Sequence, residues 1–307
     1  MRSIVVSGLL VLLTASVSAG EVARAQPLVP PPEALPDPEG ASGGLTLHSP
    51  WLTSGCDDGL AEVSEYDLQQ FRYGNLHPGT ATMVAVREAM GERREVKAIA
   101  TDTATVPVLK LHWVRGFQTG SYRYDQASFQ LVRQADGIPL RWLITSQEWC
   151  GVASKSWVNG GPLRVSSYFD GHGDLEQPLD MGSDAVLADS LWWWARAWVA
   201  AGAKPVTLRI VPSQIEARCI DTVPVPASIS SAPGSVKNPL GAQPAEVPAV
   251  LVTIRRGAYI DRLAIATDDR HALLSWQQAD GSTLTLRSIR CFDYWAKHHP
   301  ADRPAQP

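Results

Sequence analysis

Apolar and polar residues alternate between Pro107 and Phe169, and this alternation constrains the fold more than any other feature of the chain. From 109 to 117 the odd positions hold large apolar residues, namely Leu109, Leu111, Trp113 and Phe117. A period of two is typical of a β-strand with one buried and one solvated face. The pair Asp136-Gly137 and the run Asn159-Gly160-Gly161 interrupt the pattern with residues that favour tight hairpin turns. Successive strands joined by such turns predict an antiparallel sheet.

One helix is expected in this otherwise β-rich chain, near residues 183–201. Ser183 is a favourable N-cap, and Gly202 would end the helix. One apolar stripe would then consist of Leu187, Leu191, Trp194 and Trp198. The predicted fold class is therefore mainly β (α+β): a large curved antiparallel sheet or half-barrel, with this helix covering its concave face.

The run Trp192-Trp193-Trp194 is unusual for a helix that covers a sheet. Consecutive helical residues are turned by about 100°, so these three rings spread over more than half of the circumference. Either the helix is enclosed on several sides, as is usual for aromatic side chains, or at least one ring is available to a ligand, a partner or a membrane surface. The candidate ligand contacts are Trp113, Trp142, Trp192, Trp193 and Trp194.

The N-terminus has the features of a signal peptide over residues 1–19. Arg2 precedes an apolar run at 4–13 that is too short to span a bilayer, and Val17-Ser18-Ala19 offers small residues for cleavage. Cleavage after Ala25 and retention as a membrane anchor are the alternatives. We expect an exported protein, periplasmic or secreted, with no integral membrane span after cleavage.

Four further segments are expected along the chain. Residues 20–50 are rich in proline and read as a disordered tether. Residues 51–297 are expected to form a single antiparallel β domain, with a flexible insertion at 222–248, where six prolines interrupt any periodicity. A disordered tail is expected at 298–307.

Charge and cysteine content limit the partners and the compartment. The formal net charge of -4 gives no basic surface, so nucleic acid is excluded as an expected partner. The four cysteines, Cys56, Cys150, Cys219 and Cys291, allow three complete pairings, and an exported protein can keep disulfides. Among these we favour Cys219 with Cys291, because both follow strand-like segments of the C-terminal half.

Two weak catalytic candidates emerge, and no motif for a cofactor is present. Cys150 would be a nucleophile if a histidine approached it, although cysteines on strands are commonly inert. The glycine-spaced residues Asp170, His172 and Asp174 offer ligands for a divalent cation, although such a segment usually forms only a turn.

Several segments resemble a known group of proteins. The runs 106–111, 117–124, Ser146-Gln147-Glu148-Trp149-Cys150-Gly151 and 167–174 are similar to an uncharacterised family of exported bacterial proteins, some of which carry the name of the septum-formation inhibitor Maf. The resemblance implies no activity and no functional residues. Maf itself is a cytosolic α/β nucleotide hydrolase, unlike a chain with an export signal and antiparallel strands. The expected architecture is also similar to that of exported half-barrel carriers of lipids or lipoproteins.

These observations predict an exported cell-envelope protein that binds, without catalysis, an apolar or amphiphilic ligand such as a lipid, or an envelope protein. The expected binding space lies between the sheet and the helix, since aromatic-lined concave sites suit such ligands. The alternative is a secreted hydrolase or transferase that uses Cys150 or a metal at Asp170, His172 and Asp174.

Overall fold

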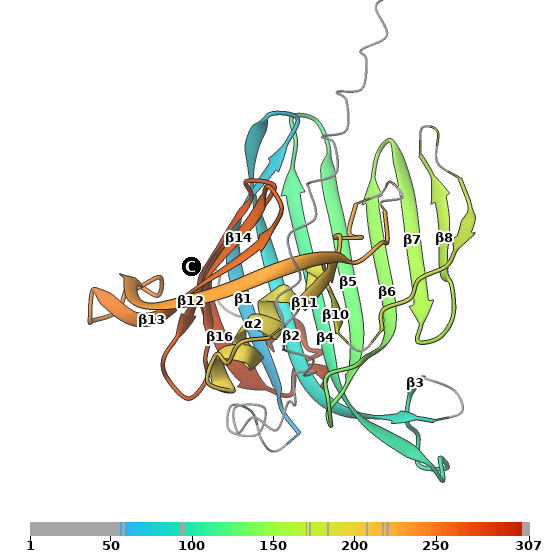
Figure 1. Ribbon diagram of the computed structural model, residues 1–307, viewed down its shortest axis with the longest axis horizontal. Helices are drawn as coiled ribbons and strands as arrows, with labels where there is room; N and C mark the ends of the chain where they lie inside the picture. The colour runs from blue at the N-terminus through green and yellow to red at the C-terminus, as the bar shows by residue number, and fades with distance from the viewer. Residues whose placement is uncertain are drawn as a thin grey trace, which may run out of the picture. The chain divides into compact units, whose positions relative to one another are not determined.

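Antiparallel pairing of successive strands dominates the computed structural model, which describes residues 56, 59–92, 96–169, 171, 173–182, 184–206, 208–216, 218 and 221–302. Within these residues sixteen strands form one sheet in the order β10-β11-β12-β13-β14-β15-β16-β1-β2-β4-β5-β6-β7-β8-β9, with β3 paired to β2 (Figure 1). Only β10 and β11 pair in parallel among these strands. The chain is thus mainly β, with a large curved sheet that does not close, and the predicted fold class is confirmed.

The strands differ widely in length, from two residues in β3 to 17 in β2. Their bounds are β1 (Ala61–Arg72), β2 (Asn75–Gly91), β3 (Val96–Lys97), β4 (Thr105–Gln118), β5 (Arg123–Arg133), β6 (Pro139–Glu148), β7 (Gly151–Val158), β8 (Leu163–Tyr168), β9 (Leu175–Gln177), β10 (Ala185–Leu187), β11 (Leu208–Val211), β12 (Val225–Lys237), β13 (Glu246–Arg256), β14 (Tyr259–Ala266), β15 (Leu273–Gln277) and β16 (Thr283–Phe292). The 3-10 turns are η1 (Ala188–Ser190), η2 (Tyr294–Ala296) and η3 (Pro300–Asp302).

The strand register lines up the buried side chains in rows across the inner face. Trp113 on β4 faces Ser128 on β5, and Trp142 on β6 faces Trp157 on β7. The indole rings of Trp142 and Trp157 lie 5.1 Å apart between centroids. The odd positions of β4 from Leu109 onward are buried, as the alternation predicted, because they share this inner face.

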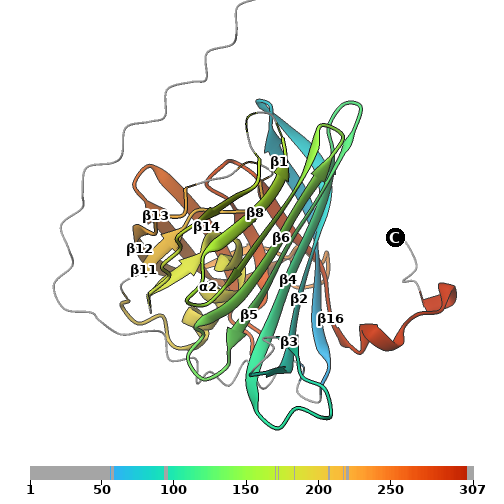
Figure 2. The same cartoon turned by 90° about the vertical axis from the view of Figure 1, so that its right-hand side faces the viewer.

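The helix α2 (Leu191–Ala200) forms where a helix was expected, but it begins later. Ser183 lies outside the described residues, and Leu187 belongs to β10, whose pairing with β11 takes up its backbone groups. In Figure 2, α2 lies between β11 and β12 on one side and β1 and β2 on the other, and it also packs against β14 and β15. Every side chain from Leu191 to Val199 is buried, so the helix is enclosed on several sides.

The expected flexible insertion at 222–248 is wrong, because most of it forms the hairpin of β12 and β13. Residues 228–237 of β12 pair in continuous register with β13. In the described part of the chain they have no strand on their other side. Proline is tolerated at such an edge, where a missing N–H removes no ladder hydrogen bond, which explains how Pro233 stands within a strand.

The other expected segments lie at the ends of the chain. The predicted signal peptide at 1–19 and the tether at 20–50 lie outside the described residues. The expected tail begins with the turn η3, while 303–307 also lie outside the described residues.

The disulfide joins Cys56 to Cys291, and the expected pairing of Cys219 with Cys291 is therefore wrong. Its Cα atoms are 5.5 Å apart although 235 positions separate the two cysteines in sequence. The register explains the pairing, because Glu62 near the start of β1 faces Cys291 on β16. Cys219 lies outside the described residues, and Cys150 is free and exposed.

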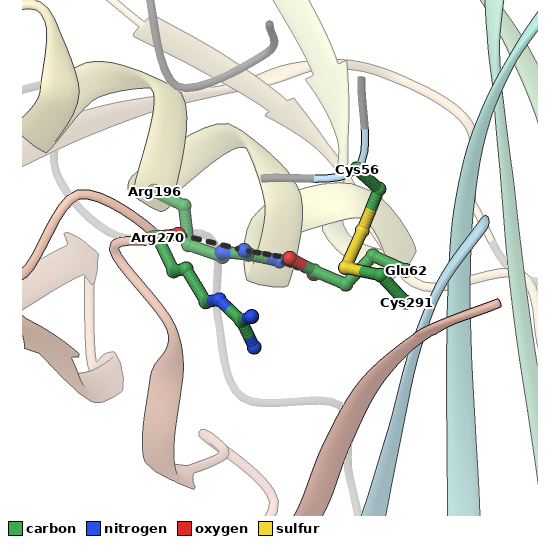
Figure 3. Close-up of a disulfide and its surroundings, with 5 residues drawn as sticks. All are labelled: Cys56, Glu62, Arg196, Arg270 and Cys291. Carbon is green, nitrogen blue, oxygen red and sulfur yellow. Dashed lines mark hydrogen bonds and ion pairs between the residues drawn. A yellow bond between two sulfur atoms is a disulfide. The ribbon is translucent and has the colours of Figure 1, made fainter. Parts of the chain in front are cut away.

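A buried ion pair anchors α2 to the sheet beside this disulfide (Figure 3). Arg196 donates from Nη1 to Glu62 Oε1 at 2.6 Å and from Nη2 to Glu62 Oε2 at 3.0 Å. Its Nε donates to the His271 carbonyl at 2.8 Å, and Nη2 also donates to the Arg270 carbonyl at 3.0 Å. One side chain thus ties the helix to β1 and to the turn between β14 and β15.

Candidate functional site

The five tryptophans predicted to contact a ligand all belong to the hydrophobic core. Their side chains are at most 5% exposed: Trp113, Trp142, Trp192, Trp193 and Trp194. Because α2 is enclosed on several sides, the rings of Trp192, Trp193 and Trp194 are all buried in the hydrophobic core. None of the five rings lies at the surface of the protein, so a surface ligand would have to meet other residues.

Of the two candidate catalytic groups, Cys150 and Asp174 belong to the described residues. Cys150 is exposed in the turn between β6 and β7. Asp174 accepts hydrogen bonds from Ser166 Oγ at 3.1 Å and from the Ser167 N–H at 3.0 Å, which makes it part of a local turn. Asp170 and His172 lie outside the described residues. Among the residues that the structure describes, no three His, Cys, Asp or Glu side chains are placed to hold a metal ion.

Exposed aromatic side chains gather at one end of the sheet. The hairpins β1–β2, β4–β5 and β6–β7 turn there, and β8 ends there, as the register and Figure 1 show. Each of these four places carries a tyrosine or a tryptophan. We name these four residues the aromatic rim: Tyr73, Tyr122, Trp149 and Tyr168. Tyr73 is 60% exposed, Trp149 78% and Tyr168 79%, and Tyr122 is half-buried. An exposed group of rings marks an interaction surface more often than scattered single residues do.

Charged residues flank the rim but are absent from its own hairpin turns. The three hairpin turns of the rim, 73–74, 119–122 and 149–150, contain no charged residue. The turn between β15 and β16, at the same end of the sheet, carries Asp280. The three turns of the rim therefore carry aromatic side chains and no charged side chains, a combination suited to contact with an apolar or amphiphilic phase.

Hydrogen bonds and ring stacking hold the rim together. The Tyr73 hydroxyl lies 2.7 Å from that of Tyr124 and 3.2 Å from that of Tyr122. Tyr124 stacks on Phe117 with centroids 4.7 Å apart, and Tyr122 stacks on Trp149 at 6.0 Å. Tyr73, Tyr122 and Trp149 of the rim are therefore linked to one another through these contacts.

The guanidinium group of Arg72 lies against two of these aromatic rings. The Arg72 guanidinium lies over the rings of Tyr73 and Tyr124, at 5.1 and 5.3 Å from their centroids. Its charge is balanced by Glu216, whose Oε2 lies 2.5 Å from Nη1. Burial, with hydrogen bonds from Tyr73 and Tyr122, raises the pKa of Tyr124 well above its usual range. The Tyr124 phenol therefore stays neutral at any physiological pH.

A row of polar side chains lies on the inner face just behind the rim. Arg115 Nε donates to Gln126 Oε1 at 2.8 Å, and Gln126 Nε2 donates to Ser146 Oγ at 2.9 Å. Gln126 Nε2 also donates to the Ile215 carbonyl at 3.0 Å, and Lys155 Nζ donates to the Gln214 carbonyl at 2.8 Å. These hydrogen bonds hold Gln214 and Ile215, in the segment that follows β11, against the inner face of the sheet.

Glu148 ends β6 beside the rim and has no hydrogen-bond partner in the part of the chain that the structure describes. The register of β5 and β6, in which Asp125 faces Gln147, places Glu148 opposite Tyr124. Its side chain lies on the inner face and the residue is only 7% exposed, although both carboxyl oxygens are unpartnered. Buried polar groups are usually satisfied, so this exception calls for an explanation.

Tight backbone contact at the base of the rim gives a prediction about stability. A Cβ at Gly79 would lie 2.4 Å from the Gly116 carbonyl oxygen on the neighbouring strand. We expect Gly79→Ala to destabilise the fold by about 1–3 kcal/mol, because the strands would have to separate. The control is Gly120→Ala in the rim itself, where a Cβ meets no atom within 4 Å. Urea titrations with equal midpoints for both variants would contradict the assigned register.

Sequence reasoning missed the aromatic rim. The rings of the rim were visible as residues next to glycine-containing turns, but only the register shows that these turns share one end of the sheet. Glu148 stood within the quoted run 146–151, where the alternation of β6 continues from Trp142 and Ile144 to Glu148, but a charged residue next to a turn was not expected to be buried.

Comparison with known proteins gives no information about the function of this chain. No family model and no curated protein matches this chain. A solved structure that matches is the beta-barrel-like protein of a domain of unknown function, DUF1849, from Brucella abortus. It is 12% identical, covers 76% of this chain and 99% of its own, and has a TM-score of 0.42. A likeness at this level says nothing about ligand or activity.

Proposed function

We propose that this chain is an exported protein of the cell envelope that binds an amphiphilic ligand, or an envelope partner with an apolar surface, through its aromatic rim. The observation that carries the proposal is the group of tyrosine and tryptophan rings at one end of the sheet, three of them on hairpin turns without a charged residue. Tyrosine and tryptophan favour boundaries where one end of the side chain is apolar and the other is wet. The binding surface thus moves from the interior, which the tryptophans fill, to the end of the sheet.

Two further observations support the compartment in this proposal. The Cys56–Cys291 disulfide is of a kind that persists in oxidising compartments. Within the described residues no helix has the length and hydrophobicity needed to cross a bilayer. The N-terminal signal peptide and the resemblance to a family of exported bacterial proteins stay predictions. The hydrolase or transferase alternative stays a prediction, since Cys150 is free and exposed but Asp170 and His172 lie outside the described residues.

Removal of two rim rings tests the proposal. We expect Trp149→Ser combined with Tyr168→Ser to weaken co-sedimentation with phospholipid vesicles by about tenfold per ring or more, because burial of a large apolar side chain contributes on the order of 1.5–3 kcal/mol. Centrifugation of the variant and the parent protein over a range of vesicle concentrations gives the two affinities.

The matched control is Trp295→Ser, which removes a ring that is 41% exposed beyond the opposite end of β16. It should leave vesicle binding unchanged. Equal loss in both variants would assign the binding to general hydrophobicity. Absence of binding by the parent protein to vesicles and to single amphiphiles would overturn the proposal.

A further inference from the structure

The unpartnered carboxyl group of Glu148 indicates which kind of amphiphile the rim would take. A carboxyl group removed from water without a hydrogen-bond partner is costly, and the cost falls when a cation or a donor meets it. Neither of its oxygens has a partner in the described part of the chain. A ligand that brings a positive charge to this place would therefore satisfy a group that the fold leaves unsatisfied.

The rings near Glu148 are of the type that binds organic cations. Tyr124 faces Glu148 across β5 and β6, Trp149 follows it in the chain, and Tyr122 stacks on Trp149. Aromatic faces attract ammonium groups, and such rings together with a carboxylate recognise quaternary ammonium ligands. An anionic head group would instead meet the Glu148 carboxyl group at this place.

None of the described cations near the rim forms a hydrogen bond or an ion pair with the Glu148 carboxyl group, and the buried Arg115 instead donates to Gln126. Arg72 is paired with Glu216, and Arg123 is paired with Asp125 at 2.7 Å on the exposed side of the hairpin. Metal binding is not supported, because no second and third ligand are placed near Glu148 among the described residues. A monovalent organic cation fits a single carboxyl group among rings better than a metal ion does.

We infer that Glu148 is the counter-ion for the ammonium head group of a cationic amphiphile whose apolar part lies on the aromatic rim. This inference rests on the proposed function and adds the ligand class to it. Because the Glu148 carboxyl is buried, the head group must displace a neighbouring side chain. Trp149, at 78% exposure, is packed least and can move most readily.

Three amphiphiles with the same chain length test the inference. Below their critical micelle concentrations, dodecyltrimethylammonium is expected to bind about tenfold more tightly than dodecyl maltoside, and dodecyl sulfate more weakly than either. Isothermal titration calorimetry on the full mature chain gives the three affinities. In Glu148→Gln the preference for dodecyltrimethylammonium should disappear, while the affinity for dodecyl maltoside stays within about twofold.

The matched control is Glu176→Gln, which removes an equal charge from an exposed pair with Arg164 on β8. It should keep the preference, and its loss there would overturn the inference by assigning the preference to net charge. Equal binding of all three amphiphiles, unchanged in Glu148→Gln, would also overturn the inference while the proposed function stands. Binding of none of them would overturn the inference together with the proposed function. A thermal melt of Glu148→Gln that matches the parent protein shows that a lost preference is not unfolding.

Discussion

Replacement of Arg196 by methionine is expected to destabilise the protein by about 3–5 kcal/mol, because it leaves a buried carboxylate without its partner. The Arg196 side chain is 1% exposed and that of Glu62 is 10% exposed, so water replaces little of the lost interaction. Glu62 raises the pKa of Arg196, outweighing the lowering effect of burial, so the guanidinium remains charged at all accessible pH values. The Arg270 and His271 carbonyls also lose their side-chain donor.

A surface pair distinguishes the loss of the buried ion pair from the general effect of removing an arginine. Arg164 and Glu176 form a comparable pair at 2.9 Å, but their side chains are 65% and 58% exposed. Arg164→Met should therefore change the free energy of unfolding by no more than about 1 kcal/mol. Urea denaturation followed by tryptophan fluorescence reports both variants, since most indole rings belong to the core around α2.

The double variant Arg196→Met with Glu62→Leu distinguishes a broken pair from a broken helix contact. When both charges are absent, no unpaired carboxylate remains, and we expect at least half of the lost stability to return. A double variant as unstable as the single one would show that the hydrogen bonds to the two carbonyls, not the ion pair, anchor the helix. A single variant as stable as the parent protein would show that α2 is not fastened at this point.

The sequence predicts the strands well because their information is local. The alternation along β4 reports which side chains share the inner face, and this depends only on neighbouring positions. The same logic fails for β12, because its prolines lower the strand propensity, and Pro233 is tolerated where β12 has no strand on its other side. The start of α2 also escapes local reasoning, since pairing of β10 with β11 overrides helix propensity at Leu187.

Long-range features are those that the sequence could not supply. Cys56 meets Cys291 because β1 pairs with β16, a closure between distant parts of the chain. The aromatic rim likewise arises from the shared register of several hairpins, and each turn on its own gives no sign of it. The burial of the run 192–194 depends on strands placed around α2 from both halves of the sheet (Figure 2).

The disulfide and the Arg196–Glu62 pair lie side by side (Figure 3). The register of β1 with β2 and β16 places them at the end of the sheet opposite the aromatic rim. Both act on β1, which joins the N-terminal strands to β16. The disulfide and the ion pair therefore restrain the end of the sheet where β1 begins. Among the described residues the rim turns carry no disulfide. Changes at the disulfide should therefore reduce stability far more than they affect binding at the rim.

The variant with Cys56→Ser and Cys291→Ser is expected to lose about 2–5 kcal/mol of unfolding free energy, because the bond restricts the unfolded chain over a separation of 235 positions. The denatured state also becomes more expanded, so the dependence of unfolding free energy on urea should steepen. Dithiothreitol should bring the parent protein to the same midpoint and leave the double variant unchanged.

Cys150→Ser is the matched control, since this cysteine is free and exposed. It should shift the unfolding free energy by no more than about 0.5 kcal/mol and keep the response to dithiothreitol. If the Cys56 and Cys291 variant were as stable as the parent protein, closure of β1 against β16 would depend on backbone pairing and packing alone. A response to dithiothreitol that disappears in Cys150→Ser would instead show that Cys150 takes part in a disulfide in solution and would contradict the pairing of Cys56 with Cys291.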